Sequence, residues 1–168
     1  MTTLEPGTIR TGRLTLLPLR ASYAEEMVAV LADPALHTFI GGAPDTAEAL
    51  RTRYERLVAG SPDPAVSWCN WVVRLDDADC LTGTVQATVS ADGVAEIAWV
   101  VGTPWQGHGI ATEAARGLVG WLRTHAVATV IAHIHPEHAA SAAVAAAAGL
   151  TPTDQWHDGE TRWQLTTG

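Results

Sequence analysis

The chain contains no lysine. Its ten basic side chains are all arginines, and 18 Asp and Glu residues give it a formal net charge of −8. A Walker A phosphate-binding loop, which requires Gly-Lys-Ser/Thr, is therefore excluded, and no lysine amine of this protein can be acylated. Nucleic-acid-binding surfaces normally carry a stripe of basic residues, which the excess of acidic residues argues against. We therefore expect no nucleic-acid partner. An acidic surface suits a cationic acceptor such as an amine, although solubility alone is the commoner explanation.

Cysteine is scarce, and long apolar runs are missing. Cys69 and Cys80 form no CxxC pair, which predicts free, buried or half-buried thiols without a disulfide. No apolar run approaches the roughly 20 residues of a membrane span, and the N-terminal segment has no hydrophobic signal core. We therefore expect a cytoplasmic protein with no membrane partner. With 168 residues, 47% of them apolar, we expect one domain over residues 1–168.

The periodicity of the apolar residues predicts a mixed α/β domain. Apolar and polar side chains alternate over residues 81–90, which is typical of an antiparallel strand with one buried face. The expected strands span residues 13–19, 66–75, 81–90, 95–101 and 127–134, with a closing hairpin at 150–156 and 161–165. The expected helices span residues 23–32, about 45–59, about 111–122 and 138–148. Ser22 and Glu25 form a candidate capping box for the first helix, and Gly149 is expected to end the last.

A glycine-rich loop joins the predicted strand at 95–101 to the next helix. In this loop, Gly107 and Gly109 let a ligand approach backbone N–H groups at a positively polarised helix start, which accepts phosphate without a lysine. A dinucleotide-binding fingerprint does not fit, because Thr112 stands at the third glycine position and no acidic residue follows about 20 residues later. The pattern Gln-x-x-Gly-x-Ala, formed by Gln106, Gly109 and Ala111, does fit. Taken alone, it also suits a plain strand-to-helix turn.

Three segments together carry a resemblance to a known family. They are "TGRLTLLPL" (11–19), "AEIAWVVGTPWQGHGIATEAARGLVGWL" (95–122) and "HPEHAASAAVAAAAGL" (135–150). In order and spacing they resemble the GCN5-related N-acetyltransferases (GNAT), and more narrowly the branch similar to ribosomal-protein-alanine N-acetyltransferases. The resemblance implies a mostly antiparallel sheet, splayed between the fourth and fifth strands and flanked by about four helices. It also implies acetyl-CoA as co-substrate without a metal, and direct attack of a primary amine on the thioester in a ternary complex.

The resemblance also assigns roles to particular residues. Glu96 matches a carboxylate used as general base, and Ser141 matches a serine near the CoA sulfur that assists protonation of the thiolate. His138 stands where the family usually has Asn, and Ala145 where many members have a tyrosine general acid. The expected cofactor contacts are Trp99, Val100, Val101, Gln106, Gly107, His108, Gly109, Ile110, Ala111, Thr112, His138 and Ser141.

The amine acceptor is the least defined partner. A protein N-terminal α-amine and a small-molecule amine both remain open, as do a monomer and a homodimer. Period-two alternation puts Trp68 and Asn70 on one strand face and Trp71 on the other, without saying which face borders the cleft. His37 and Phe39, in a predicted loop that covers the acceptor in this family, complete the expected acceptor contacts.

Rival interpretations rest on single features. A non-catalytic acyl-CoA sensor on the same fold is favoured by the missing tyrosine and by His138. A dinucleotide-dependent oxidoreductase is less consistent with the glycine spacing. His133, His135 and His138 suggest a metal site, but no cysteine completes it and only Glu137 is a nearby acid.

Overall fold

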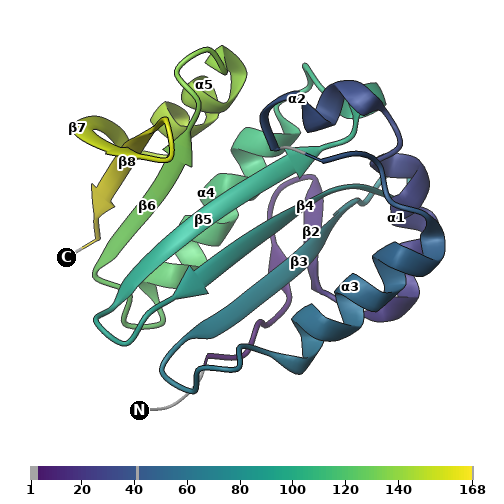
Figure 1. Cartoon of the computed structure of the whole chain (residues 1–168), viewed down its shortest axis with the longest axis horizontal. Coiled ribbons are helices and arrows are strands. Elements are labelled where there is room, and N and C mark those ends of the chain that lie inside the picture. Colours follow the sequence, from purple (N-terminus) through teal and green to yellow (C-terminus); the bar gives the residue numbers. More distant parts are fainter. Residues whose placement is uncertain (1–3, 41, 168) are drawn as a thin grey trace.

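The computed structural model describes residues 4–40 and 42–167, without the side chains of residues 39 and 40. Its eight-stranded sheet has the order β1-β2-β3-β4-β5-β6-β8-β7 (Figure 1). The strands are β1 (Ile9–Arg10), β2 (Leu14–Pro18), β3 (Ser67–Leu75), β4 (Cys80–Val89), β5 (Val94–Val101), β6 (Thr129–Ile134), β7 (Thr151–His157) and β8 (Glu160–Thr166). The α-helices are α1 (Ala24–Val30), α2 (His37–Ile40), α3 (Ala47–Ala59), α4 (Ile110–Arg123) and α5 (Ala139–Ala147).

All neighbouring strands are antiparallel except β5 and β6, which run parallel. The β5–β6 pairing covers only three residues of each strand, from Val94 to Glu96 and from Thr129 to Ile131. Beyond Glu96 the two strands separate, while β5 stays paired with β4 as far as Val101. These are the fourth and fifth strands of the sequence prediction, because the two-residue β1 was not expected. The predicted mixed α/β fold with a splayed sheet is confirmed.

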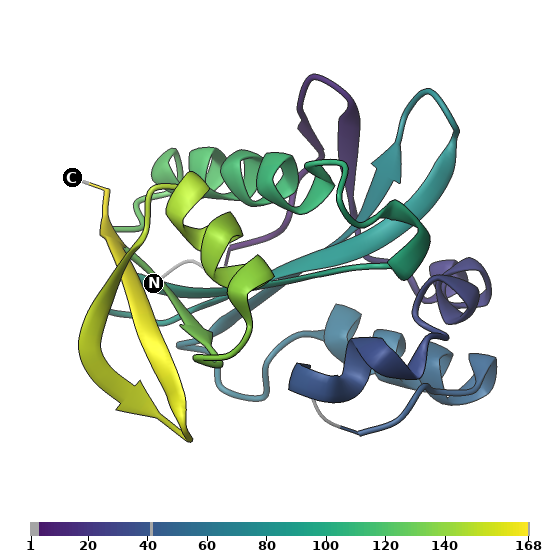
Figure 2. The ribbon, with the colours of Figure 1, turned by 90° about the horizontal axis from the view of Figure 1, so that it is seen from above.

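The sheet separates two groups of helices. Figure 2 shows α4 and α5 on one face and α1 to α3 on the other. The larger core lies under α4 and α5, where Val85, Ala87 and Ile97 are buried together with Leu118. The smaller core lies under α1 and α3 and includes Val72. On that second face Gln86 and Thr88 of β4 are exposed, so the helices leave part of the sheet open.

The start of the first helix differs from its prediction. Ser22 does not cap it: residues Ala21–Tyr23 form a 3₁₀ turn, and the helix that follows has no side-chain cap. The Ala24 N–H, one of the donors that a Ser22 cap would bind, instead donates to the Ala21 carbonyl, so the turn supplies a backbone acceptor in place of the hydroxyl. The segment around His37, predicted as loop, contains the short helix α2.

Gly149 ends α5 as predicted. It follows Ala148 with φ +99°, and the Leu150 N–H donates to the Ala145 carbonyl at 3.0 Å. This left-handed residue lets the chain reverse direction at the helix end, a geometry that glycine adopts without steric cost.

Both cysteines are free thiols, as predicted. Burial raises the pKa of Cys69 to about 11, so this thiol is protonated at neutral pH and is no candidate nucleophile. No helix in residues 4–40 and 42–167 combines the length and apolar character needed to cross a membrane.

Trp71 is a core residue. It is fully buried, its indole N–H donates to the Gly7 carbonyl at 2.7 Å, and its ring meets that of Trp121 edge-on at a centroid distance of 5.1 Å. Its expected contact with the amine acceptor is therefore wrong, because the side chain lies on the face covered by α4. Alternation grouped the residues of this strand correctly, and burial identifies the face.

We expect Trp71→Phe to lower the free energy of unfolding by about 1–3 kcal/mol, because it removes part of a fully buried ring and leaves the half-buried Gly7 carbonyl without its donor. Urea unfolding monitored by circular dichroism measures the change. Trp156→Phe is the matched control: Trp156 is 61% exposed, so the same chemical change there should cost less than about 0.5 kcal/mol. Equal losses in the two variants would contradict the structural role of Trp71.

Candidate active site

The glycine loop leaves the N-terminus of α4 open. Gly107 and Gly109 have φ values of +79° and +76°, and Gly109 occupies the N-cap position without any side-chain cap. The Ile110 side chain is buried in the core and anchors the first turn. The N–H groups of the first helical residues have no acceptor inside the helix, so they point outward where an anionic group can bind.

The Gln106 side chain fastens this loop to the end of β5. Its amide nitrogen donates to the Val101 carbonyl at 3.0 Å. The Gln106 side chain thus ties the start of the loop to β5, and its backbone leads directly into Gly107. The following residues Gly107, His108 and Gly109 are exposed, so the loop is accessible to a ligand.

Arg13, which no sequence pattern singles out, lies beside the glycine loop. The guanidinium Nη2 of Arg13 is 3.4 Å from the point where a Cβ on Gly109 would lie. Glu113 holds this arginine: Oε1 accepts from Arg13 Nε at 2.8 Å, and Oε2 accepts from the Arg13 backbone N–H at 2.8 Å and from the Thr11 hydroxyl. We call this set, Thr11, Arg13 and Glu113, the hairpin clasp. It joins the β1–β2 hairpin to the first turn of α4.

The hairpin clasp borders a hollow of about 530 Å³. Arg13, Gly109, Thr112 and Arg116 are among its lining residues. Partial burial opposes ionisation of Glu113, but the hydrogen bonds from Thr11 and Arg13 and the charge of Arg13 outweigh it and lower the pKa of this carboxyl. The clasp thus keeps a carboxylate and a guanidinium paired beside an open helix N-terminus, with a second arginine nearby.

Glu96 lies at the point where β5 and β6 separate. It is the last residue of β5 paired with β6, and its side chain is 53% exposed. From residue 97 onward, the edge of β5 that faces β6 forms no ladder pair among the described residues. Alternate backbone N–H and C=O groups on this edge, in the segment that contains Trp99, Val100 and Val101, are therefore available to an extended ligand. The carboxylate of Glu96 stands at the inner end of that gap.

His133 is the second ionisable residue at this point. It lies two positions beyond Ile131, the register partner of Glu96, and its Nδ1 is 3.2 Å from Glu96 Oε2. In the sequence it was considered only as part of a histidine cluster. Its approach to Glu96 depends on strand register, which no local pattern reveals.

Ser141 and His138 form a pair at the start of α5. The Ser141 hydroxyl oxygen is 3.4 Å from His138 Nε2, and both residues are half-buried. Desolvation lowers the pKa of His138, His135 acts in the same direction, and Glu160 opposes the shift. His138 is thus mainly neutral at pH 7, so its imidazole can accept a hydrogen bond from a hydroxyl.

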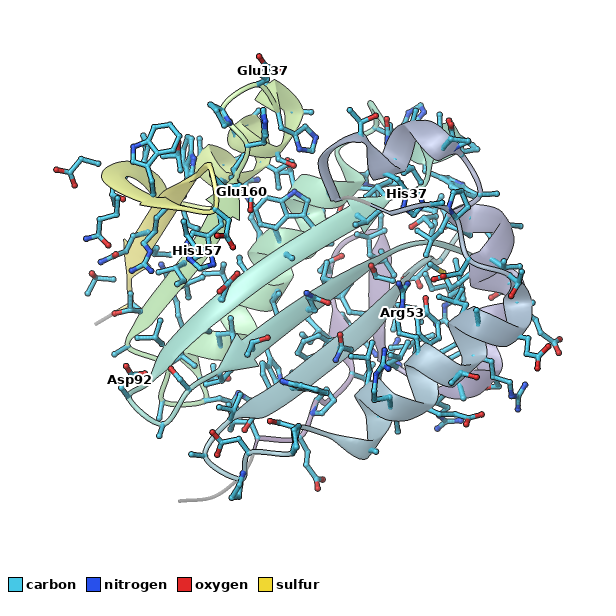
Figure 3. The ribbon with its side chains drawn as sticks, in the orientation of Figure 1. His37, Arg53, Asp92, Glu137, His157 and Glu160 are labelled. Atoms are coloured by element: carbon cyan, nitrogen blue, oxygen red, sulfur yellow. The ribbon has the colours of Figure 1, made fainter. Side chains whose placement is uncertain are left out.

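The remaining acceptor-side candidates fall into two groups. Trp68 and Asn70 lie on the open sheet face and line a hollow of about 510 Å³ between β3 and α3. In the register, Trp68 is opposite Thr88, which is opposite Glu96, so two strand spacings of roughly 5 Å separate tryptophan from carboxylate. His37 instead lies on α2, toward the C-terminal end of β5 (Figure 3). The side chain of Phe39 lies outside the described residues.

Comparison with known proteins identifies the family. A family model for the acetyltransferase (GNAT) domain matches residues 13–151, so the chain belongs to the GNAT acetyltransferases, as the sequence resemblance indicated. No curated protein matches the chain by sequence.

Solved structures of the family share its fold. An acetyltransferase (GNAT family) from Bacillus anthracis has a TM-score of 0.82 at 19% identity, covering 96% of this chain and 99% of its own. RimL, a ribosomal L7/L12 α-N-protein acetyltransferase in complex with coenzyme A, has a TM-score of 0.80 at 14% identity and coverages of 95% and 98%. AAC(6')-Ib, in complex with paromomycin and acetyl-CoA, has a TM-score of 0.74 at 18% identity and coverages of 92% and 93%.

We expect Glu113→Gln to lower the free energy of unfolding at pH 7 by about 1–3 kcal/mol, because it removes the charge that the hairpin clasp satisfies. The folded-state pKa of Glu113 is lowered, so the unfolded chain takes up the proton first as the pH falls. The contribution is therefore present above pH 5 and is lost through pH 4 and below. Urea unfolding of both proteins at pH 7 and pH 3.5 should show a gap that closes in acid.

Glu25→Gln is the matched control for this prediction, because Glu25 is an exposed acid in the first turn of α1. Its change should stay within about 0.5 kcal/mol at both pH values. A gap for Glu113→Gln that persists unchanged at pH 3.5 would rule out ionisation of this carboxyl as its source.

Proposed function

We propose that the protein is an N-acetyltransferase that moves an acetyl group from acetyl-CoA to a primary amine in a ternary complex. The observation that carries this proposal is one continuous feature. The free edge of β5 begins at Glu96 and leads, past Val101, to the open N-terminus of α4. A ligand with a thioester at one end and a diphosphate at the other matches the two ends of this feature.

The proposed cofactor position follows the polar groups of the feature. The pyrophosphate binds the backbone N–H groups from Gln106 to Thr112, where neither glycine has a side chain to block it. The pantetheine arm extends along Trp99, Val100 and Val101 and pairs with the backbone on the free edge. Arg13 and Arg116 supply positive charge at the outer end, for the cofactor's phosphates. The thioester then reaches the gap beside Glu96.

Two residues, Glu96 and Ser141, carry out the proton transfers of the proposed reaction. The carboxylate of Glu96 takes a proton from the substrate ammonium, directly or through water, and the neutral amine attacks the thioester carbonyl. The carbon–nitrogen bond forms, the carbon–sulfur bond breaks, and CoA leaves as a thiolate. The Ser141 hydroxyl gives its proton to the thiolate while it accepts one from the new amide nitrogen. Glu96 finally releases its proton to solvent, which completes the exchange.

The acceptor is proposed to be a cation that reaches Glu96 across the open sheet face. Trp68 offers an aromatic face for an ammonium group, and Asn70, Glu5 and Asp63 line the same hollow. Both a protein α-amine, the acceptor named for the α-N-protein acetyltransferase RimL, and a small amine suit these groups. His37 is the candidate contact at the other end of β5.

An acyl-CoA sensor is the second candidate, and one observation favours it. Ala145, which stands where many family members have a tyrosine acid, is fully buried and offers no side-chain donor. Proton delivery to the thiolate therefore depends on Ser141 or on water. A sensor would bind the cofactor through the same loop and strand without needing that step.

We expect Gly109→Ala to weaken CoA binding at least 10-fold, measured by isothermal titration, because the added methyl group obstructs the phosphate position and crowds Arg13. Gly159→Ala is the matched control: Gly159 has φ +80° and nothing within 4 Å of the added carbon. Both changes carry a backbone strain of about 1–2 kcal/mol, so thermal midpoints should fall in both. Full CoA affinity in Gly109→Ala would refute the phosphate assignment.

We expect Glu96→Gln to lower kcat about 10²-fold or more with CoA affinity unchanged, as for loss of a general base. Thiol release, measured over a panel of N-terminal peptides, polyamines and aminoglycosides, first identifies the acceptor.

Ser141→Ala should lower kcat more than it weakens CoA binding. Tight CoA binding with no turnover of any amine, in wild type as in Glu96→Gln, would instead establish the sensor.

A further inference from the structure

A chain of three side chains crosses the gap between β5 and β6. Its middle residue, His133, has a side chain only 6% exposed. Its Nδ1 atom is buried and makes no well-aligned hydrogen bond with any described residue, although Glu96 Oε2 lies 3.2 Å from it.

The other ring nitrogen of His133 fixes where its proton lies. Arg162 on β8 donates from Nε to His133 Nε2 at 3.3 Å. A guanidinium only donates hydrogen bonds, so His133 Nε2 must carry a lone pair, and the single proton of the neutral imidazole must lie on Nδ1. This assignment directs an N–H donor at the Glu96 carboxylate.

The surroundings of the imidazole are charged and compact. From β7, the His157 ring lies 4.9 Å from that of His133, measured between centroids, and His157 is paired with Asp158 at 3.3 Å. Glu160 lies on the same face of β8 as Arg162, since the two are separated by one residue. Figure 3 shows His157 and Glu160 toward the gap between β6 and β5. His157 thus packs against the imidazole of His133, and Glu96 approaches its Nδ1 atom.

We propose that His133 is a positioning residue for Glu96: its Nδ1–H holds Oε2 of the carboxylate and leaves Oε1 to meet the substrate ammonium or its water. This inference rests on the proposed role of Glu96 as the base. His133 does not relay the proton, because a second proton on Nε2 would displace Arg162. The proton taken from the amine stays on Glu96 until solvent removes it.

The geometry explains why the site needs such a residue. Glu96 projects from the last paired residue of β5 onto an open face, where its long side chain has several rotamers available. Catalytic groups must be held within about half an ångström of their productive position. The buried His133 on the neighbouring strand β6 restricts the carboxylate of Glu96 to a position near Nδ1, at the point where the two strands begin to separate.

The first test concerns the proton itself and needs neither cofactor nor acceptor. Long-range ¹H–¹⁵N correlation spectra distinguish Nδ1–H from Nε2–H in each histidine, and loss of a signal in His133→Asn identifies His133. We expect the Nδ1–H tautomer in the wild type and a mixture in Arg162→Met, which lacks the donor. A predominant Nε2–H form in the wild type would overturn the proposal.

The second test uses two amides that differ in reach. The amide nitrogen of Asn lies near the Nδ1 position of a histidine, whereas that of Gln lies near the Nε2 position. We expect His133→Asn to keep kcat within about 3-fold and His133→Gln to lower it at least 10-fold, both with an unchanged KM for acetyl-CoA. Thermal midpoints measured alongside establish that both variants fold. Equal rates in the two variants, high or low, would contradict a donor at Nδ1.

Glu96→Gln in the same assay separates the two levels of inference. If this variant keeps the full rate, Glu96 is not the base, and the proposed mechanism fails together with the role of His133. If it loses the rate while His133→Gln keeps it, only the positioning role fails. Loss in Glu96→Gln and His133→Gln, with rescue in His133→Asn, supports both.

Discussion

The short parallel pairing between β5 and β6 is the constraint on which the rest of the site depends. Three residues of pairing hold the two halves of the sheet together, and the separation that follows leaves one edge of β5 without a neighbour. In a closed sheet that edge would be saturated with hydrogen bonds. Here its backbone N–H and C=O groups from residue 97 onward have no ladder partner on the β6 side among the described residues, with Glu96 at one end and the start of α4 at the other. The proposed contacts of the pantetheine arm and the pyrophosphate lie along this line.

The rest of the fold holds this gap in place from outside. Gln106 binds the last carbonyl of β5, and the hairpin clasp fixes the β1–β2 hairpin against the first turn of α4. Arg116 donates to the Ala147 carbonyl at 2.9 Å and so connects α4 to the end of α5. The clasp and the Arg116 bond join elements that are far apart in the sequence.

Local signals in the sequence were sufficient for much of the fold. The alternation in residues 81–90 predicted the buried face of β4, and the glycines at 107 and 109 predicted the turn before α4. The Ser22 cap failed because residues Ala21–Tyr23 form a 3₁₀ turn, in which the Ala24 N–H donates to the Ala21 carbonyl. Two-residue β1 carries too few residues for any periodicity, so it was not predicted.

The site was harder to predict because its pairs are distant in sequence. Glu113 and Arg13 are 100 residues apart, and the proximity of His133 to Glu96 follows from the register of two strands joined through a helix. Alternation placed Trp68 and Trp71 on opposite faces, but only the packing of Trp71 against Trp121 identifies the inner one. Sequence patterns therefore predicted which elements form the site, while the side-chain pairs within it required the structure.

The arginines beside Gly109 have a chemical consequence. A positive charge on the path by which an activated acyl donor arrives is hazardous if it belongs to a lysine, since the free amine form of lysine is itself a nucleophile. Arg13 and Arg116 carry the same charge on a guanidinium that stays protonated at any physiological pH. In the proposed binding mode, the attraction for an anionic acyl donor is thus supplied by groups that are inert toward a thioester. Such a protein would attract the reagent without having its own side chains acylated.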